Sequence, residues 1–314
     1  MTFAVLFPGQ GSQYPGMADP WLEHPDGRSV LEEASAALGR DVARACRDEA
    51  LLATTEFVQP ALLACDVAAF RVLQAHGIRA GAAAGHSLGE FAALVAAGAM
   101  DLPGALEAVG IRGRAMQEAS NRAPGTMTAL IGLTLEEAIE VCDATRDGSV
   151  LAVANENAAN QQVLSGSVDA VLRAEDEARR RGARAIRLKV AGAFHSPLME
   201  PALGPIREVL ARTEIREPGF PVVANVTADF VREPASIREL LSRHVVSPVR
   251  WDRSTRVLAE AGFETFVEAG PGQVLSKLAR RALPGVRAVA VGSPADIASL
   301  AGPSAASARE EVPS

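Results

Sequence analysis

A serine between two glycines has the strongest potential for chemistry in this sequence. Residues 85–89 read Gly-His-Ser-Leu-Gly, which fits the nucleophile elbow, a sharp strand-to-helix turn that projects a serine hydroxyl. At a helix N-terminus, free backbone N–H groups and the helix dipole favour the negative charge of a tetrahedral intermediate. The pentapeptide alone is weak evidence, because turns of small residues with serine are common. The flanking patterns, described below, make Ser87 the candidate nucleophile.

A nucleophilic serine needs a general base, and histidine is the usual one. The chain has five histidines: His24, His76, His86, His195 and His244. His86 adjoins the serine, so we expect its side chain to point elsewhere, into packing or a turn hydrogen bond. His195 follows a predicted strand at 185–189, at a junction between two domains where a histidine can overhang a cleft. His195 is therefore the candidate base, although without Ser87 it would be interpreted as an ordinary loop histidine.

Alternating strand and helix patterns surround these residues and predict how they are positioned. The apolar run at 3–7 ends in Pro-Gly-Gln-Gly at 8–11, which indicates a buried strand entering a tight turn. Small residues at 80–84 and an apolar segment at 90–97 predict the strand and helix on either side of the elbow. Further helices are predicted at 29–52, 60–76, 236–244, 254–261 and 274–282, and further strands at 222–226 and 265–268. This alternation is typical of a doubly wound, parallel α/β sheet.

The segment from about 126 to 189 has a different order of elements. Its patterns predict strands at 126–133, 150–154, 162–165 and 185–189, and helices at 135–144 and 168–181. The order β-α-β-β-α-β is the ferredoxin-like arrangement. We therefore predict a large domain at 1–122 and 190–301 with a small ferredoxin-like domain inserted at 123–189. Residues 302–314 are small, polar and charged, and are expected to form a disordered tail.

Composition argues against several classes of function. The chain has 314 residues with 48% hydrophobic content, enough for a large core, and a formal net charge of −7 that gives no attraction to nucleic acid or an anionic membrane. Cys46, Cys65 and Cys142 lie far apart, so neither a disulfide framework nor a metal site is predicted, and a cytoplasmic location fits. The N-terminal segment lacks the basic region of a signal peptide, and no stretch reaches the roughly 20 apolar residues of a membrane span.

Six segments, in order along the chain, resemble the malonyl-CoA:acyl carrier protein transacylase family. They are Pro-Gly-Gln-Gly-Ser-Gln at 8–13, Gly-His-Ser-Leu-Gly-Glu at 85–90, Arg-Gly-Arg-Ala-Met-Gln at 112–117, Gly-Ala-Phe-His-Ser at 192–196, Ser-Pro-Val-Arg-Trp at 247–251 and Gly-Pro-Gly at 270–272. The resemblance covers nearly the whole chain. It implies an α/β-hydrolase-like large domain, a small subdomain similar to the predicted insertion, and a discrete acyltransferase of fatty-acid or polyketide synthesis.

The resemblance also implies roles for individual residues. Ser87 would be the nucleophile, and His195 the general base that later returns its proton to the leaving thiol. The backbone N–H groups of Gln10 and Leu88 would hold the oxyanion. The main-chain carbonyl of Arg250, and not a carboxylate, would orient His195.

Substrate recognition is implied for three side chains. Arg112 would bind the free carboxylate of a malonyl group through two parallel, charge-assisted hydrogen bonds, whereas an arginine without this sequence context would be interpreted as solvated. Arg114, two positions on, is expected to face away from Arg112. Gln10 would also contact the substrate, and Phe194 would fill the space that an α-methyl branch needs, which favours malonyl over methylmalonyl.

The implied reaction moves a malonyl group from CoA, through an ester on Ser87, to the phosphopantetheine thiol of an acyl carrier protein, with no bound cofactor. Because carrier proteins are usually acidic, arginines at 179–181, 184 and 187, or at 280–281, are candidate docking residues. The alternatives are a serine hydrolase, a transferase for a larger or branched acyl group between carrier proteins, and a non-catalytic partner in a synthase complex. The residues fit fatty-acid and polyketide pathways alike.

Overall fold

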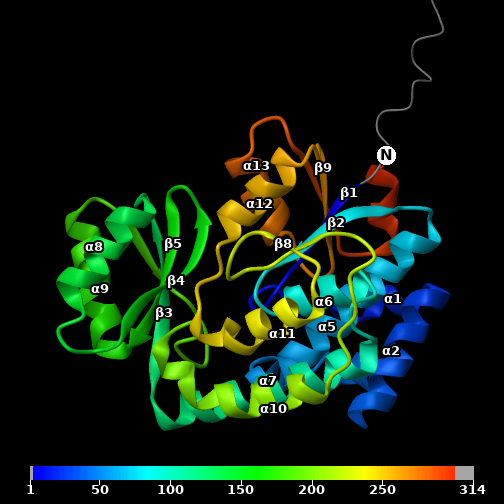
Figure 1. The fold of residues 1–314 in the computed structure, drawn as a ribbon, viewed down its shortest axis with the longest axis horizontal. Helices are drawn as coiled ribbons and strands as arrows, with labels where there is room; N and C mark the ends of the chain where they lie inside the picture. Colours follow the sequence, from blue (N-terminus) through cyan, green and yellow to red (C-terminus); the bar gives the residue numbers. More distant parts are fainter. Residues whose placement is uncertain (1–2, 301–314) are drawn as a thin grey trace, which may run out of the picture.

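A six-stranded sheet forms the centre of the larger part of the molecule (Figure 1). The computed structural model describes residues 3–300, so the tail predicted at 302–314 lies outside the described residues. In spatial order the strands are β10 (Arg287–Val291), β9 (Thr265–Ala269), β1 (Phe3–Phe7), β2 (Ala80–Gly85), β7 (Val222–Val223) and β8 (Phe230–Val231). All neighbours pair in parallel except β7 and β8, which are antiparallel.

Helices cover both faces of this sheet. Successive side chains of β1 alternate between the two faces, and those on each face belong to a different hydrophobic core, so both faces must be buried. The larger core contains residues of α2 (Pro25–Leu38), α5 (Thr55–Ala75), α6 (Gly89–Ala96), α7 (Leu102–Arg122), α10 (Leu203–Arg212) and α11 (Pro234–Arg243). The other core contains residues of α12 (Trp251–Glu260) and α13 (Val274–Ala282). The predicted doubly wound α/β architecture is confirmed.

The single helix predicted at 29–52 is wrong. The chain instead forms α2, α3 (Val42–Ala45) and α4 (Glu49–Leu52). Gly39 ends α2 in the left-handed conformation, at φ 60°, and the side chains of Asp41 and Asp48 accept hydrogen bonds from the first amides of α3 and α4. The helix end at Gly39 and the two new helix starts at Asp41 and Asp48 break the helix that the apolar periodicity predicted.

Several elements were not predicted from the sequence. They are β8, β10, α10, the long helix α7 that carries Arg112, the short helix α1 (Asp19–Leu22) and the 3-10 helices η1 (Pro197–Ala202), η2 (His244–Val246) and η3 (Pro294–Leu300). None of the helices between residues 3 and 300 combines the length and apolarity that a membrane crossing demands.

A second, four-stranded sheet stands beside the first, shown in green in Figure 1. It has the spatial order β4 (Leu151–Ala158), β5 (Gln161–Ser167), β3 (Gly125–Ile131) and β6 (Arg184–Arg187), and every neighbouring pair is antiparallel. With α8 (Leu135–Thr145) and α9 (Val168–Arg180) it has the predicted chain order β-α-β-β-α-β. Residues of these elements form a hydrophobic core of their own. The domain boundaries at 123 and 189 stay a prediction.

The small sheet is joined to the loop before α12. Asn155 of β4 forms an isolated parallel bridge with Val249, whose N–H donates to the carbonyl of Ala154 and whose carbonyl accepts from the N–H of Glu156. The loop before α12 is thereby fixed to the small sheet. This loop and η2 supply the contacts of His195 described below.

Candidate active site

Ser87 lies in a tight turn between β2 and α6, as the elbow pattern predicted. Its φ is 51°, a left-handed value that is uncommon for a residue with a side chain. The turn needs both glycines: a Cβ on Gly85 would collide with the backbone of Gly89, and a Cβ on Gly89 would collide with the carbonyl of Phe7. The strained turn aims the hydroxyl away from the sheet and into a pocket.

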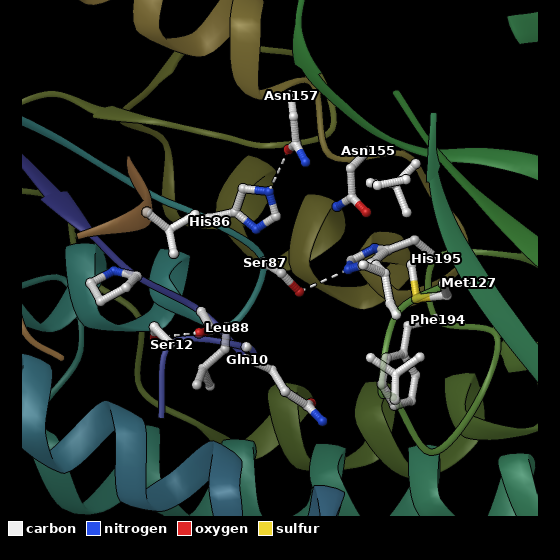
Figure 2. A pocket seen from close by; sticks show the side chains of 18 of the residues that line it. Gln10, Ser12, His86, Ser87, Leu88, Met127, Asn155, Asn157, Phe194 and His195 are labelled. Atoms are coloured by element: carbon white, nitrogen blue, oxygen red, sulfur yellow. Dashed lines mark hydrogen bonds between the residues drawn. The ribbon is translucent and has the colours of Figure 1, made fainter. Parts of the chain in front are cut away.

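His195 meets the serine hydroxyl directly (Figure 2). The Oγ of Ser87 lies 2.7 Å from Nε2 of His195, and Nδ1 of His195 lies 3.1 Å from the carbonyl oxygen of His244 and 3.0 Å from that of Ser247. Since carbonyl oxygens only accept, the proton of the neutral ring is on Nδ1. Nε2 is therefore free to accept the proton of Ser87, which is the tautomer a general base needs.

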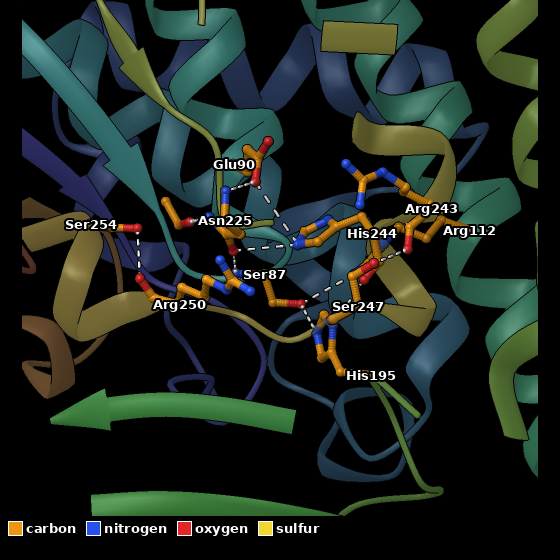
Figure 3. Close-up of polar contacts among 11 residues, drawn as sticks. Ser87, Glu90, Arg112, His195, Asn225, Arg243, His244, Ser247, Arg250 and Ser254 are labelled. Atoms are coloured by element: carbon orange, nitrogen blue, oxygen red, sulfur yellow. Dashed lines mark hydrogen bonds and ion pairs between the residues drawn. The ribbon is translucent and has the colours of Figure 1, made fainter. Parts of the chain in front are cut away.

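The prediction that the carbonyl of Arg250 orients His195 is wrong. Arg250 is the N-cap of α12, and its carbonyl accepts from the N–H and the hydroxyl of Ser254, both at 2.9 Å (Figure 3). A carbonyl that starts a helix points along the helix axis and is committed there. The carbonyls of His244 and Ser247 take the expected place, so main-chain orientation of the base holds with different residues.

Arg112 extends from α7 to the same hydroxyl. Its guanidinium is almost fully buried; Nη2 donates to the Oγ of Ser87 at 3.1 Å and Nη1 donates to Oε1 of Gln59 at 2.6 Å. Its Nε has no hydrogen-bond partner among the described residues. Burial lowers the pKa of Arg112 to about 10, against the opposing charge of Glu90, so the side chain remains cationic at neutral pH. Arg114 faces away as expected, half-exposed and 3.9 Å from Glu56.

Two backbone amides are available beside the nucleophile. Within residues 3–300 the N–H groups of Gln10 and Leu88 donate to no protein group, and both residues line the pocket. The N–H of Ser87 is not available, because it donates to Oδ1 of Asn225 at 2.7 Å. This pattern fits the expectation that Gln10 and Leu88 hold the oxyanion.

The pocket around these groups has a volume of about 270 Å³ and lies between the two sheets. Phe194, almost fully buried, lines it next to His195. Apolar side chains of the small-sheet side and of α13 form much of the remaining wall: Met127, Ala129, Val163, Leu188, Val190, Val274, Leu275 and Leu278. His86 is also at the wall, where its Nε2 lies 2.9 Å from Oδ1 of Asn157; this contact joins distant segments of the chain and is not the predicted turn hydrogen bond. No cluster of His, Cys, Asp and Glu suited to a metal ion occurs in the described part of the chain.

Burial shapes the ionisation of the site. It lowers the pKa of His195 to about 3, with a further decrease from the positive charge of Arg112, while the two carbonyl hydrogen bonds act in the opposite direction. The imidazole is therefore neutral, and able to accept a proton, throughout the physiological pH range. Burial raises the pKa of Glu90 to about 7, partly offset by the amide of Asn225 and by Arg112.

Sequence reasoning missed three polar residues that support the site. Gln59 accepts a hydrogen bond from Arg112. Glu90 and His244 both contact Asn225, which accepts from the N–H of Ser87 (Figure 3). The signal available for Gln59 and Glu90 was a polar residue within an otherwise apolar helical segment, since such a residue is buried only with partners. His244 carried no such signal because it follows a polar stretch.

Comparison with known proteins agrees with this geometry. The family model described as "Acyl transferase domain" matches residues 4–302. The chain belongs to the acyl transferase family. The acyltransferase is 40% identical over 299 residues to the malonyl CoA-acyl carrier protein transacylase of Bacillus subtilis (strain 168), and the match covers 94% of each chain.

Solved structures agree with the fold of this acyltransferase. The malonyl CoA-acyl carrier protein transacylase of Coxiella burnetii superposes with a TM-score of 0.92 at 37% identity, covering 96% of each chain. A malonyl-transacylase in complex with its type II polyketide synthase acyl carrier protein gives a TM-score of 0.92 at 38% identity, covering 95% of this chain and 98% of that chain. The fold and the enzyme class predicted from the sequence are confirmed.

Proposed function

We propose that this acyltransferase moves a malonyl group from CoA to the phosphopantetheine thiol of an acyl carrier protein, with Ser87 as the acyl carrier in between. The observation that supports malonyl most directly is the buried guanidinium of Arg112, 3.1 Å from the Oγ of Ser87. A buried cation beside the nucleophile favours an acyl group that ends in a carboxylate, because an anion compensates its lost hydration better than a neutral acceptor does. The Nε of Arg112, which has no hydrogen-bond partner within residues 3–300, is proposed as a further donor to that carboxylate.

In the first half-reaction, the hydroxyl proton of Ser87 passes to Nε2 of His195 while Oγ attacks the thioester carbon. The N–H groups of Gln10 and Leu88 stabilise the oxyanion, and the carbonyls of His244 and Ser247 stabilise the imidazolium through Nδ1–H. The carbon–sulfur bond then breaks, CoA takes the proton from His195, and the malonyl group remains as an ester on Ser87.

The second half-reaction reverses these steps with a different thiol. His195 accepts the proton of the phosphopantetheine thiol, sulfur attacks the malonyl ester, and Oγ of Ser87 leaves with the proton from His195. The same oxyanion donors act in both directions, so no bound cofactor is needed. The proposal includes a cytoplasmic location, which three buried free cysteines fit.

Phe194 supports malonyl over methylmalonyl. Its side chain is 5% exposed, packs in the large core and lines the pocket beside His195. A ring fixed by packing cannot easily move aside for an α-methyl branch. Discrimination by one methyl group is worth about 1–3 kcal/mol.

The two groups of candidate docking arginines differ in how many of their members form ion pairs. In the first group, Arg179, Arg180, Arg181 and Arg187 form ion pairs with Glu175, Asp176, Glu177 and Glu140, whereas the exposed Arg184 of β6 forms none within residues 3–300. On α13, the exposed Lys277, Arg280 and Arg281 form no ion pair within residues 3–300. Helix α13 also borders the pocket through Val274, which is 48% exposed. We therefore place the acidic carrier protein on α13.

Intact-protein mass spectrometry after brief incubation with malonyl-CoA tests the proposal. We expect a malonyl adduct that is absent from Ser87→Ala, weaker adducts with methylmalonyl-CoA and acetyl-CoA, and transfer of the malonyl group to a phosphopantetheinylated carrier protein. No adduct with any of the three thioesters would contradict the malonyl assignment and favour a larger, carrier-bound acyl group. Release of free malonate faster than transfer would make the protein a hydrolase.

A further inference from the structure

His244 contacts the base His195 directly and is linked to the nucleophile Ser87 only through Asn225. Its carbonyl oxygen accepts from Nδ1 of His195 at 3.1 Å, and its side-chain Nε2 lies 3.3 Å from Oδ1 of Asn225. The two imidazole rings also pack together, with centroids 5.3 Å apart and an interplanar angle of 56°. His244 is 1% exposed, so all of these contacts are made away from solvent.

Asn225 connects His244 to the nucleophile. Its Nδ2 donates to the carbonyl of Gly85 at 2.7 Å, and its Oδ1 accepts from the N–H of Ser87 at 2.7 Å. A carbonyl on one side and an N–H on the other allow only one orientation of the amide. The amide of Asn225 thus holds the strained elbow on both sides of His86, and any group that fixes the amide also fixes Ser87.

The surroundings of His244 fix its tautomer. Its Nε2 faces two acceptors, Oδ1 of Asn225 at 3.3 Å and Oε2 of Glu90 at 3.9 Å, whereas its Nδ1 has no hydrogen-bond partner among the described residues. A neutral ring in this place therefore carries its proton on Nε2. Burial, together with the positive charge of Arg112, holds the pKa of His244 well below its usual value, in agreement with a neutral ring.

We propose that the side chain of His244 is a positioning element for the reaction. Its Nε2–H donates to Oδ1 of Asn225, and Asn225 in turn fixes the Ser87 elbow. The carbonyl of the same residue accepts from His195. One residue then sets the nucleophile and the base relative to each other, although they come from different segments of the chain. The inference rests on the proposed role of Ser87 as nucleophile.

The competing explanation is that the imidazole only fills space behind His195. The two explanations differ in what they require of a substitute. A positioning role requires an N–H donor at the place of Nε2, whereas a packing role requires only volume. Glutamine and methionine form a matched pair for this question, because both are unbranched and extend as far from Cα as the Nε2 of histidine. Only glutamine ends in a donor.

The experiment compares His244→Gln with His244→Met. We expect His244→Gln to acylate Ser87 from malonyl-CoA within about threefold of the wild-type single-turnover rate, and His244→Met to be slower by about 10- to 100-fold, since small misplacements of reacting groups cost up to about 10²-fold. The KM for malonyl-CoA is expected to change little, because His244 does not line the pocket. Thermal unfolding of both variants checks that each is folded.

A second readout separates this inference from the malonyl assignment. The rate at which a fluorophosphonate labels Ser87 depends on the elbow and on His195 but not on any acyl specificity. The same order, wild type close to His244→Gln and well above His244→Met, is expected. Equal labelling rates in the folded Gln and Met variants, or a faster Met variant, would overturn the inference. Labelling in the expected order without any malonyl adduct would support it while contradicting the malonyl proposal.

Discussion

The Oγ of Ser87 and Nε2 of His195 lie 2.7 Å apart, although 108 positions separate the two residues in the chain. Both residues have positive φ values, 51° and 56°, so each backbone is held in a conformation that is uncommon for a residue with a side chain. Strain at both partners of one hydrogen bond persists only where the surroundings over-determine it. Here the close packing of the elbow glycines fixes the turn at Ser87, and hydrogen bonds to the carbonyls of His244 and Ser247 fix the ring of His195.

Replacing His195 by alanine should slow acylation of Ser87 by about 10²- to 10⁴-fold, the usual contribution of a general base. Single-turnover mass spectrometry with malonyl-CoA measures the rate. His76→Ala is a suitable control, because His76 is exposed and contacts the carbonyl of Val72 at the end of α5. An acylation rate for His195→Ala close to that of the control would mean that another group takes the proton.

Replacing Arg112 by alanine should lower kcat/KM for malonyl-CoA by about 10²-fold, since one or two charge-assisted hydrogen bonds to the carboxylate are lost. Acetyl-CoA lacks the carboxylate, so the ratio of acetyl to malonyl transfer should rise. Arg114→Ala, a change on the same helix at a half-exposed side chain, should leave both rates near wild type. An unchanged acetyl-to-malonyl ratio in Arg112→Ala would show that the guanidinium does not select the acyl group.

Glu90 and His195 should affect the pH dependence of stability in opposite directions. Below pH 6.5 the unfolded chain protonates His195, whereas the folded chain, with a pKa of about 3, does not, so this group makes stability fall as the pH falls. Between pH 4.5 and about 7 the folded chain keeps a proton on Glu90 that the unfolded chain has lost, so this group makes stability fall as the pH rises.

Glu90→Gln removes the second effect and keeps an oxygen acceptor for the amide of Asn225. The free energy of unfolding of this variant, measured by denaturant titration between pH 4.5 and 7, should rise with pH relative to wild type by up to about 1.4 kcal/mol per pH unit. Parallel pH curves for the two proteins would mean that the carboxyl of Glu90 is already ionised at pH 4.5.

Reversing the charges of Arg280 and Arg281 to Glu should raise the KM for the acyl carrier protein about tenfold or more at low salt, with a smaller effect at high salt. Acylation of Ser87 from malonyl-CoA should be unchanged, because neither side chain lines the pocket. The same reversal at Arg179 and Arg180 is the comparison, since those arginines are already neutralised by acidic neighbours. A larger effect at Arg179 and Arg180 would place the carrier protein on α9 instead.

The sequence by itself determined those features that depend on local order along the chain. The apolar run of β1, the small residues of β2 and the glycines of the elbow specify a buried strand, a close approach and a strained turn. The nucleophile could therefore be predicted from a few neighbouring residues. The β-α-β-β-α-β order was also visible, because each of its elements has its own periodicity.

Only the tertiary structure decided which distant groups meet. The carbonyl that orients His195 could not be located from residue types, since every residue has a carbonyl and its direction depends on the local backbone; Arg250 begins a helix, whereas Ser247 does not. The roles of Gln59 and His244 were hidden for the same reason, because their partners lie 53 and 19 positions away. A buried polar side chain must find a partner, but packing of the whole chain determines which partner is within reach.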